Sequence, residues 1–255
     1  MLRRIEHGPV LELRLDRPPA NALSPELIEA LRDAVAAASA SVSRGRAGAL
    51  VLSGAEGMFS AGLDVPRFLT LDRAGVRAAW SAFYELMELM AASPIPIAAA
   101  VTGHAPAGGC VLALFSDWRV MASGEFKIGL NEVRVGLPMP PPIQAAATHV
   151  LGLRRAETIC TTAELFPAGR ALELGLVDEL APPGKVVEQA LAWLRRLLEL
   201  PPLALRKTRA QARGALIEAC RRSHAALDEV VDAWLSEETQ GALKALVERL
   251  SAKAP

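Results

Sequence analysis

The chain has 255 residues, of which 51% are apolar, so it is long enough to bury a core and too apolar to be intrinsically disordered. Its 28 basic and 28 acidic residues give a formal net charge of zero, which argues against nucleic acid as a partner. No apolar run reaches the roughly 20 residues of a membrane helix, and the opening MLRRIEHG is too short and too charged for a signal peptide. We therefore expect a cytoplasmic protein that makes no membrane contact.

The first half of the chain alternates predicted strands with predicted helices. Residues 9–16 alternate apolar and polar side chains, as a half-buried strand does, and Ser24 followed by Pro25 marks a helix start. A second amphipathic helix is predicted in residues 74–93. Further strands are predicted in the apolar runs AGALVLSG, PIPIAAAVTG and WRVMAS.

After Pro142 the pattern is almost wholly helical, with ALELGLVDEL (residues 171–180) as one strand-like interruption. The last two helices are predicted at about residues 202–231 and 237–252. The alternation indicates an α/β fold, with a core that carries the site in residues 1–195 and a C-terminal helical oligomerisation region in residues 196–255. A doubly wound nucleotide-binding fold is disfavoured, because the chain contains neither GxGxxG after a strand nor GxxxxGK[ST].

The cysteines and histidines predict neither a disulfide framework nor a metal site. Three cysteines are odd in number and far apart, and the four histidines lack metal-ligand spacing. These residues are Cys110, Cys160, Cys220, His7, His104, His149 and His224.

Three loops rich in small residues are candidates for a site: FSAGLD (59–64), APAGGC (105–110) and IGLNE (128–132). In the second loop, Gly108 and Gly109 precede a predicted helix and would let backbone approach a ligand. The free N–H groups of a helix N-terminus suit a developing oxyanion. The alternative is a tight strand-to-helix turn that simply requires glycine.

Glu132, in the third loop, is a lone carboxylate among apolar neighbours. It is either a helix N-terminal residue that faces water, with Asn131 as the cap, or a partly desolvated general base whose pKa is raised by its surroundings.

These loops, together with LDRPPANALS, KIGLNEVRVGLPMP and AGRALELGLVDEL, resemble the crotonase family, also called the enoyl-CoA hydratase/isomerase superfamily. The resemblance covers nearly the whole chain. It implies the crotonase fold, a spiral of repeated ββα units followed by C-terminal helices, and an assembly that is a homotrimer or a dimer of trimers.

The resemblance also implies the parts of an acyl-CoA site. The backbone N–H groups of Leu63 and Gly108 would form an oxyanion hole for the thioester carbonyl, with no metal and no cofactor beyond the coenzyme A thioester itself. Coenzyme A would be held by backbone groups of Ala20, Ala22, Leu23, Ala61 and Asp64. Candidates for its phosphates are Arg17, Arg249 and Lys253.

One departure from the family pattern indicates the reaction. Hydratases resemble GGGCE where this chain has AGGCV, so Val111 replaces the first of two carboxylates and Glu132 keeps the second. A single base suffices to move a double bond. The motifs from PAGGC to IGLNE look like the Δ3,Δ2-enoyl-CoA isomerase branch of the family, which keeps one glutamate in the LNE context. The alternatives are a hydratase that uses one carboxylate, another crotonase activity such as a hydrolase, and a non-catalytic acyl-CoA-binding protein.

The remaining residues of these motifs are assigned structural roles. Asp64 is expected to anchor its loop, Asn131 to cap a helix, and Asp117 to pair with Arg119 along a strand. His104 is expected to be non-catalytic and Cys110 to be a buried packing thiol. Four residues at helical spacing are expected in the core, although in the family such a helix can also form the wall of the acyl pocket: Trp80, Phe83, Met87 and Met90. Four prolines are expected to reshape the acyl end of the pocket: Pro138, Pro140, Pro141 and Pro142.

Overall fold

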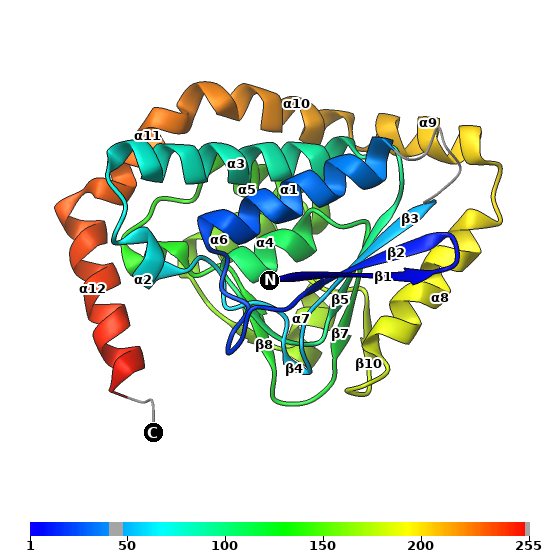
Figure 1. Ribbon diagram of the computed structural model, residues 1–255, viewed down its shortest axis with the longest axis horizontal. Coiled ribbons are helices and arrows are strands. Elements are labelled where there is room, and N and C mark those ends of the chain that lie inside the picture. Colours follow the sequence, from blue (N-terminus) through cyan, green and yellow to red (C-terminus); the bar gives the residue numbers. More distant parts are fainter. Residues whose placement is uncertain (41–47, 253–255) are drawn as a thin grey trace.

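The computed structural model describes residues 1–40 and 48–252, and its centre is a six-stranded sheet. The strand order is β1-β2-β3-β5-β7-β10; β1 runs antiparallel to β2, and the other neighbours pair in parallel (Figure 1). These strands are β1 (Leu2–His7), β2 (Val10–Leu15), β3 (Ala49–Ser53), β5 (Ile97–Val101), β7 (Trp118–Ala122) and β10 (Glu179–Ala181).

A second sheet shows that the chain repeats one unit. Its order is β4-β6-β8-β9, and each of its first three strands directly follows a strand of the large sheet. The chain thus makes strand pairs β3–β4, β5–β6 and β7–β8, each followed by helix, which is the predicted spiral of ββα units. The strands are β4 (Gly57–Met58), β6 (Gly103–Pro106), β8 (Lys127–Gly129) and β9 (Phe166–Pro167).

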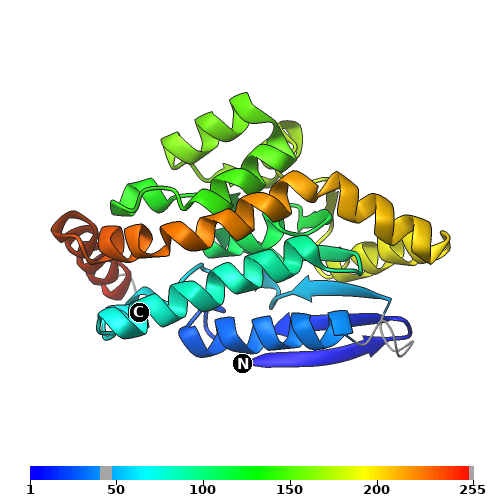
Figure 2. The same cartoon turned by 90° about the horizontal axis from the view of Figure 1, so that it is seen from above.

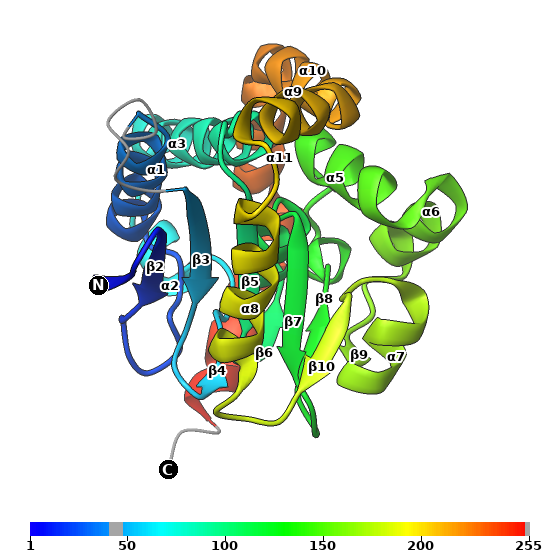
Figure 3. The same cartoon turned by 90° about the vertical axis from the view of Figure 1, so that its right-hand side faces the viewer.

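Both faces of the large sheet are buried at its central strands β3, β5 and β7, which explains the continuous apolar runs of these strands. In β3, Leu50 and Leu52 join the main core, whereas Ala49 and Val51 face the other side and pack with α8 (Val186–Leu198). Figure 3 shows α8 lying across the sheet in front of β5 and β7. Alternate residues of β3 therefore pack into two different hydrophobic cores, one on each face of the sheet.

The other face is covered by helices that run side by side in Figure 2: α1 (Pro25–Ala40), α3 (Arg73–Ala92) and α10 (Gly214–Ser223). Shorter elements connect the units: α2 (Val65–Phe68), α4 (Gly108–Leu114), the 3₁₀ helix η2 (Glu132–Val135), α5 (Pro141–Leu151), α6 (Leu153–Thr162) and α7 (Ala168–Leu174). The chain ends in α9 (Pro202–Ala212), the 3₁₀ turn η3 (His224–Ala226), α11 (Leu227–Leu235) and α12 (Glu237–Ser251). In Figure 1, α12 descends at the left, at the opposite end from α8.

The structure corrects two of the predicted elements. ALELGLVDEL is not one strand: α7 runs to Leu174, Gly175 ends it in the left-handed region, and only Glu179–Ala181 forms strand β10. The long helix predicted over residues 202–231 is divided into α9, α10 and α11, with a break at Arg213 and a 3₁₀ turn at His224. The predicted division after residue 195 falls inside α8 and stays a prediction.

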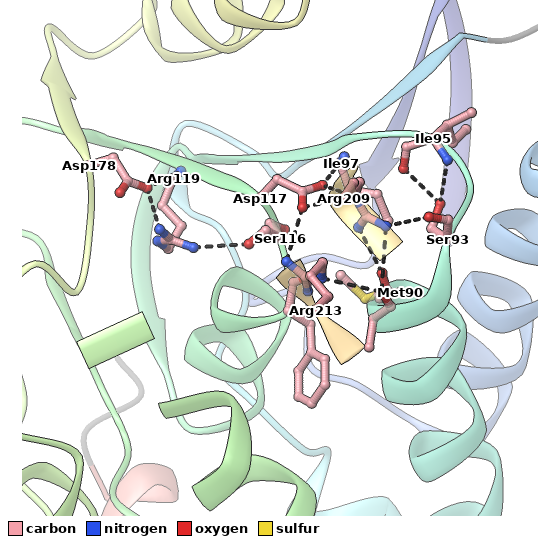
Figure 4. Close-up of polar contacts among 12 residues, drawn as sticks. Met90, Ser93, Ile95, Ile97, Ser116, Asp117, Arg119, Asp178, Arg209 and Arg213 are labelled. Carbon is pink, nitrogen blue, oxygen red and sulfur yellow. Dashed lines mark hydrogen bonds and ion pairs between the residues drawn. The ribbon is translucent and has the colours of Figure 1, made fainter. Parts of the chain in front are cut away.

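The C-terminal helices are attached to the core by a buried group of charges that we call the arginine cluster: Asp117, Arg209 and Arg213 (Figure 4). Asp117 accepts hydrogen bonds from Arg209 Nε at 2.9 Å and from Arg213 at 3.0 Å. The predicted pairing of Asp117 with Arg119 is wrong. Arg119 instead pairs with Asp178 at 2.6 Å, because the next strand, β10, brings that carboxylate beside it.

Candidate active site

A pocket lies where α3, η2, α11 and α12 meet the small-residue loops. Among the described residues that line it, Glu132 is the only charged one, and most of the others are apolar. A concave apolar surface with a few polar groups is the usual form of a small-molecule site. The lining residues are Ala61, Leu63, Val65, Trp80, Phe83, Ala107, Gly108, Asn131, Glu132, Val135, Leu137, Ile143, Trp234, Leu243 and Leu246.

The two predicted oxyanion donors lie side by side in the lining of this pocket. A Cβ built on Gly108 would stand 3.4 Å from the backbone nitrogen of Leu63, so the two loops are in contact. Within residues 1–40 and 48–252, no group accepts a hydrogen bond from the backbone N–H of Leu63 or from that of Gly108. In the bridge to Leu23, the donor is the N–H of Asp64 and not that of Leu63. Gly108 is the first residue of α4, where backbone N–H groups have no partner within the helix. Both N–H groups therefore remain available for a ligand oxygen.

The close approach of the loops depends on local backbone geometry. Gly62 has φ +86°, and a Cβ there would lie 2.9 Å from that of Ala107, so only glycine fits. Ala107 itself has φ +47°, a conformation that L-residues rarely adopt, directly before Gly108. Strained backbone at this point is consistent with a functional role for the turn.

Glu132 is the first residue of η2 and only 6% exposed, so the alternative of a water-facing glutamate is wrong. Burial raises the pKa of Glu132 to about 7, against a smaller lowering by the backbone amides of residues 131 and 132. A carboxyl group with a pKa near neutrality exchanges protons readily at physiological pH, which is the property required of a general base.

Unpartnered polar atoms concentrate in this pocket. Seven buried side-chain nitrogen or oxygen atoms of the described residues have no hydrogen-bond partner, and four of them belong to residues that line it. These four are Trp80 Nε1, Asn131 Oδ1, Glu132 Oε2 and Trp234 Nε1. Because native proteins leave few buried polar groups unpaired, the concentration marks the pocket as a site rather than packing.

Two residues near Glu132 bear on its chemistry. The prediction that Asn131 caps the helix is wrong: it occupies the position before η2, but its side chain makes no capping hydrogen bond. Val111, at the position of the first hydratase carboxylate, is fully buried in the main core and is not among the lining residues. The site therefore contains one acid where hydration would use two.

The segments predicted to hold coenzyme A run alongside each other. Leu23 and Leu63 form a parallel bridge, in which Leu23 N donates to Gly62 O at 2.8 Å and Asp64 N donates to Leu23 O at 3.1 Å. Ala61 N donates to Ala20 O at 2.9 Å. Leu23 is fully buried and uses both its backbone groups in the bridge, whereas Ala20, Ala22 and Ala61 are partly exposed.

The predicted phosphate ligands are less favourably placed. Arg17 pairs with Asp64 and donates to Ala22 O at 3.2 Å, so its charge is already partnered. Arg249 is exposed on α12, and Lys253 lies outside the described residues. Asp64 also caps α2 by accepting from Arg67 N at 3.2 Å, which confirms its anchoring role.

The other sequence-based assignments have mixed outcomes. His104 accepts from Lys127 N at 3.1 Å, lies against Phe126 and does not line the pocket, and Cys110 is fully buried. Trp80 and Phe83 line the pocket, whereas Met87 and Met90 belong to the core. Of the four prolines, Pro140 and Pro141 start α5, which carries the lining residue Ile143.

Sequence reasoning missed the contribution of the C-terminal helices to the pocket. Trp234 of α11 and Leu243 and Leu246 of α12 reach it from more than 100 residues beyond Glu132. Their apolar spacing predicts only amphipathic helices, so no local signal identifies them as lining residues.

The described residues contain neither a metal-binding cluster nor a membrane-spanning helix. No group of three or more histidine, cysteine, aspartate or glutamate side chains within residues 1–40 and 48–252 is arranged to hold a metal ion. In the same part of the chain, no helix combines the length and apolarity that crossing a membrane requires.

Comparison with known proteins agrees with this geometry. The sequence model of the enoyl-CoA hydratase/isomerase family matches residues 6–253. A probable enoyl-CoA hydratase, echA17, of Mycobacterium avium is 37% identical over 198 residues, which are 78% of this chain and 76% of that protein. Human mitochondrial enoyl-CoA delta isomerase 1 is 31% identical over 207 residues, 81% of this chain and 68% of that protein.

The fold agrees as well. The crystal structure of human mitochondrial delta3-delta2-enoyl-CoA isomerase matches with a TM-score of 0.94 at 27% identity and covers 100% of this chain and 99% of the other. The mixed α/β architecture is thus the crotonase fold, and the chain belongs to the enoyl-CoA hydratase/isomerase family.

Proposed function

We propose that this enzyme converts 3-enoyl-CoA to trans-2-enoyl-CoA, with Glu132 as the single base. The observation that carries the proposal is that Glu132 is the only carboxylate among the described residues that line the pocket, while the apolar Val111 occupies the position of the first hydratase carboxylate. Moving a double bond requires one group that takes a proton and returns it. Hydration requires in addition an activated water and a second acid–base group, each such group typically contributing about 100- to 10,000-fold.

The proposed reaction has two proton transfers. The Glu132 carboxylate removes a proton from C2 of the substrate, and the electron pair of that C–H bond delocalises into a dienolate. The negative charge on the thioester oxygen is stabilised by the N–H groups of Leu63 and Gly108, a contribution that is typically worth about 100- to 1000-fold per donor. The protonated Glu132 then returns the proton to C4, so that the double bond lies between C2 and C3 and the carboxylate is regenerated.

Hydration of 2-enoyl-CoA is the second candidate function. It is favoured by one observation, that the 37% identical relative from Mycobacterium avium is named a probable enoyl-CoA hydratase. It would require the water to be activated with Glu132 as the only acid.

One pair of assays on the purified wild-type protein separates the two functions. We expect trans-3-hexenoyl-CoA to be converted to its 2-enoyl isomer with a kcat/KM at least about 100-fold higher than that for hydration of crotonyl-CoA, the low end of the contribution of one acid–base group. Comparable or faster hydration would contradict the proposal and support the hydratase. Binding of acyl-CoA without turnover in either assay would support a non-catalytic binding protein.

The remaining properties are proposed on the same basis. The two proton transfers use only protein groups and the coenzyme A thioester, so we propose no further cofactor. A homotrimer or dimer of trimers in the cytoplasm is proposed from the family resemblance.

A further inference from the structure

The pocket has an open end and a closed end, which differ in the exposure of their side chains. Leu63, Val65, Val135 and Leu246 are partly exposed and mark the side that communicates with solvent. In contrast, six other side chains of the lining are at most 2% exposed: Trp80, Phe83, Leu137, Ile143, Trp234 and Leu243. An acyl chain that enters from the solvent side extends toward this buried part of the lining, in which the aromatic rings are the largest side chains.

The two tryptophans at the closed end contact each other. Trp80 of α3 and Trp234 of α11 have ring centroids 5.9 Å apart at an angle of 68°, an edge-to-face arrangement that holds both rings in place. Helices from distant parts of the chain thus meet across the end of the pocket, and neither ring can move without disturbing the other.

A second aromatic layer stands behind the tryptophans. Phe68 lies 5.3 Å from Trp234, and Tyr84 lies 6.2 Å from Trp80, measured between ring centroids. Phe68 and Tyr84 are each 1% exposed, so they are backed by further packed core rather than by solvent. Close-packed interiors yield poorly to added volume, so a chain that reaches the tryptophans cannot continue past them.

We propose that Trp80 and Trp234 form the closed end of the acyl pocket and restrict this enzyme to short-chain acyl-CoA thioesters. The inference rests on the proposed function only in taking the ligand to be an acyl-CoA. Each methylene that enters the pocket tightens binding about fourfold, the factor that corresponds to ~0.8 kcal/mol per buried CH₂. Methylenes that find no room beyond the tryptophans add nothing or weaken binding.

The test is calorimetric binding of saturated acyl-CoA thioesters, which do not react, from butanoyl-CoA to dodecanoyl-CoA. For the wild-type protein we expect affinity to rise by about fourfold per methylene for the short thioesters of the series and then to stop rising before dodecanoyl-CoA. A continued fourfold gain per methylene to dodecanoyl-CoA would overturn the inference without any variant. Failure of the whole acyl-CoA series to bind more tightly than free coenzyme A would instead contradict the proposed function.

Variants then locate the cause. In Trp80→Ala we expect dodecanoyl-CoA to bind at least tenfold more tightly relative to hexanoyl-CoA than in the wild type, whereas Trp80→Phe, which keeps a ring, shifts the preference less. Trp193→Ala is the matched control, because Trp193 stacks on Trp118 between α8 and the sheet and lies outside the pocket. If Trp80→Ala and Trp234→Ala both fold and both keep the wild-type length preference, the tryptophans do not set it.

Discussion

Two buried polar regions of this molecule are built in opposite ways. In the arginine cluster, Asp117 is bonded to both guanidinium groups and to the backbone amide of Ile97 at 2.8 Å, and the arginines also donate to carbonyl oxygens at the ends of α3 and α4 (Figure 4). In the pocket, Glu132 is buried, but its Oε2 has no partner among the described residues. The charged groups of the arginine cluster are paired with other groups of the protein, whereas in the pocket Oε2 of Glu132 remains available to a ligand.

The two regions are connected through the C-terminal helices. The cluster fixes α9 and α10 to the core, since Arg209 donates to Met90 O at 3.2 Å and Arg213 donates to Phe115 O at 2.8 Å. The helices that follow supply Trp234 and Leu243 to the pocket. The arginine cluster thus supports the helices that form part of the pocket wall.

The largest effect on stability is expected from breaking the cluster. Arg209→Ala removes one guanidinium, so Asp117 loses one of its two arginine partners and the carbonyl oxygens of Met90 and Ser93 lose their donor. Removing one partner of a buried ion pair typically costs about 3–5 kcal/mol. Urea unfolding should therefore show a much lower midpoint for this variant. The control is Arg170→Ala, which removes an exposed pair with Glu173 and should cost less than about 1 kcal/mol. Equal losses for the two variants would show that the cluster does not contribute as described.

In the pocket, by contrast, removing the charged group is expected to increase the stability of the protein. Burial raises the pKa of Glu132 from 4.5 to about 7, so the folded protein holds this proton more tightly than the unfolded chain. The favourable contribution is fully present below pH 4.5 and is lost as the pH rises through about 7, where a buried carboxylate must ionise. Glu132→Gln removes that loss and should stabilise the protein, by ~2–3 kcal/mol more at pH 8.5 than at pH 5.

Unfolding curves of the wild type and the variant at the two pH values measure this difference. Exposed Glu56 has no ion-pair partner within the described ranges, so Glu56→Gln is the matched control and should change stability little at either pH. A Glu132→Gln variant that is equally or less stable at pH 8.5 would show that the carboxylate has a stabilising partner in the folded protein.

A smaller effect, on hydration activity, is expected from placing a carboxyl group at position 111. Val111→Glu should introduce weak hydration of crotonyl-CoA while isomerisation persists, although a second buried carboxyl group costs stability and raises the pKa of both acids by mutual repulsion. Val111→Gln is the control: its side chain has nearly the shape of glutamate but is not an acid, so it should introduce no hydration activity. If the folded Val111→Glu protein also gains none, pocket shape rather than residue 111 separates the two activities.

Much of the central fold could be predicted from local patterns. The apolar runs of β3, β5 and β7 are recognisable because strands buried on both faces are continuously apolar. Strand β1 was not predicted, because LRRIEH carries charges at partly exposed positions on the sheet edge. The breaks within residues 202–231 were missed because the apolar spacing continues through Arg213 and His224.

The candidate site was predictable only in part. The loops that carry Leu63, Gly108 and Glu132 have distinctive local sequences, and the family resemblance assigns them together. The bonds of Asp117 join residues 92 and 96 positions away, and no periodicity of one segment predicts a partner at that separation. The sequence favoured Arg119, two residues along the strand, and the tertiary fold decided otherwise.

The central claim, that Glu132 carries the proton in both directions, is tested most directly by isomerase turnover of the purified, folded Glu132→Gln protein. The amide keeps the shape of the side chain but cannot accept the proton, so kcat should fall by at least about 1000-fold while acyl-CoA affinity changes little. Near wild-type turnover of trans-3-hexenoyl-CoA by this variant would contradict the account, and Glu132 would then be a buried structural residue.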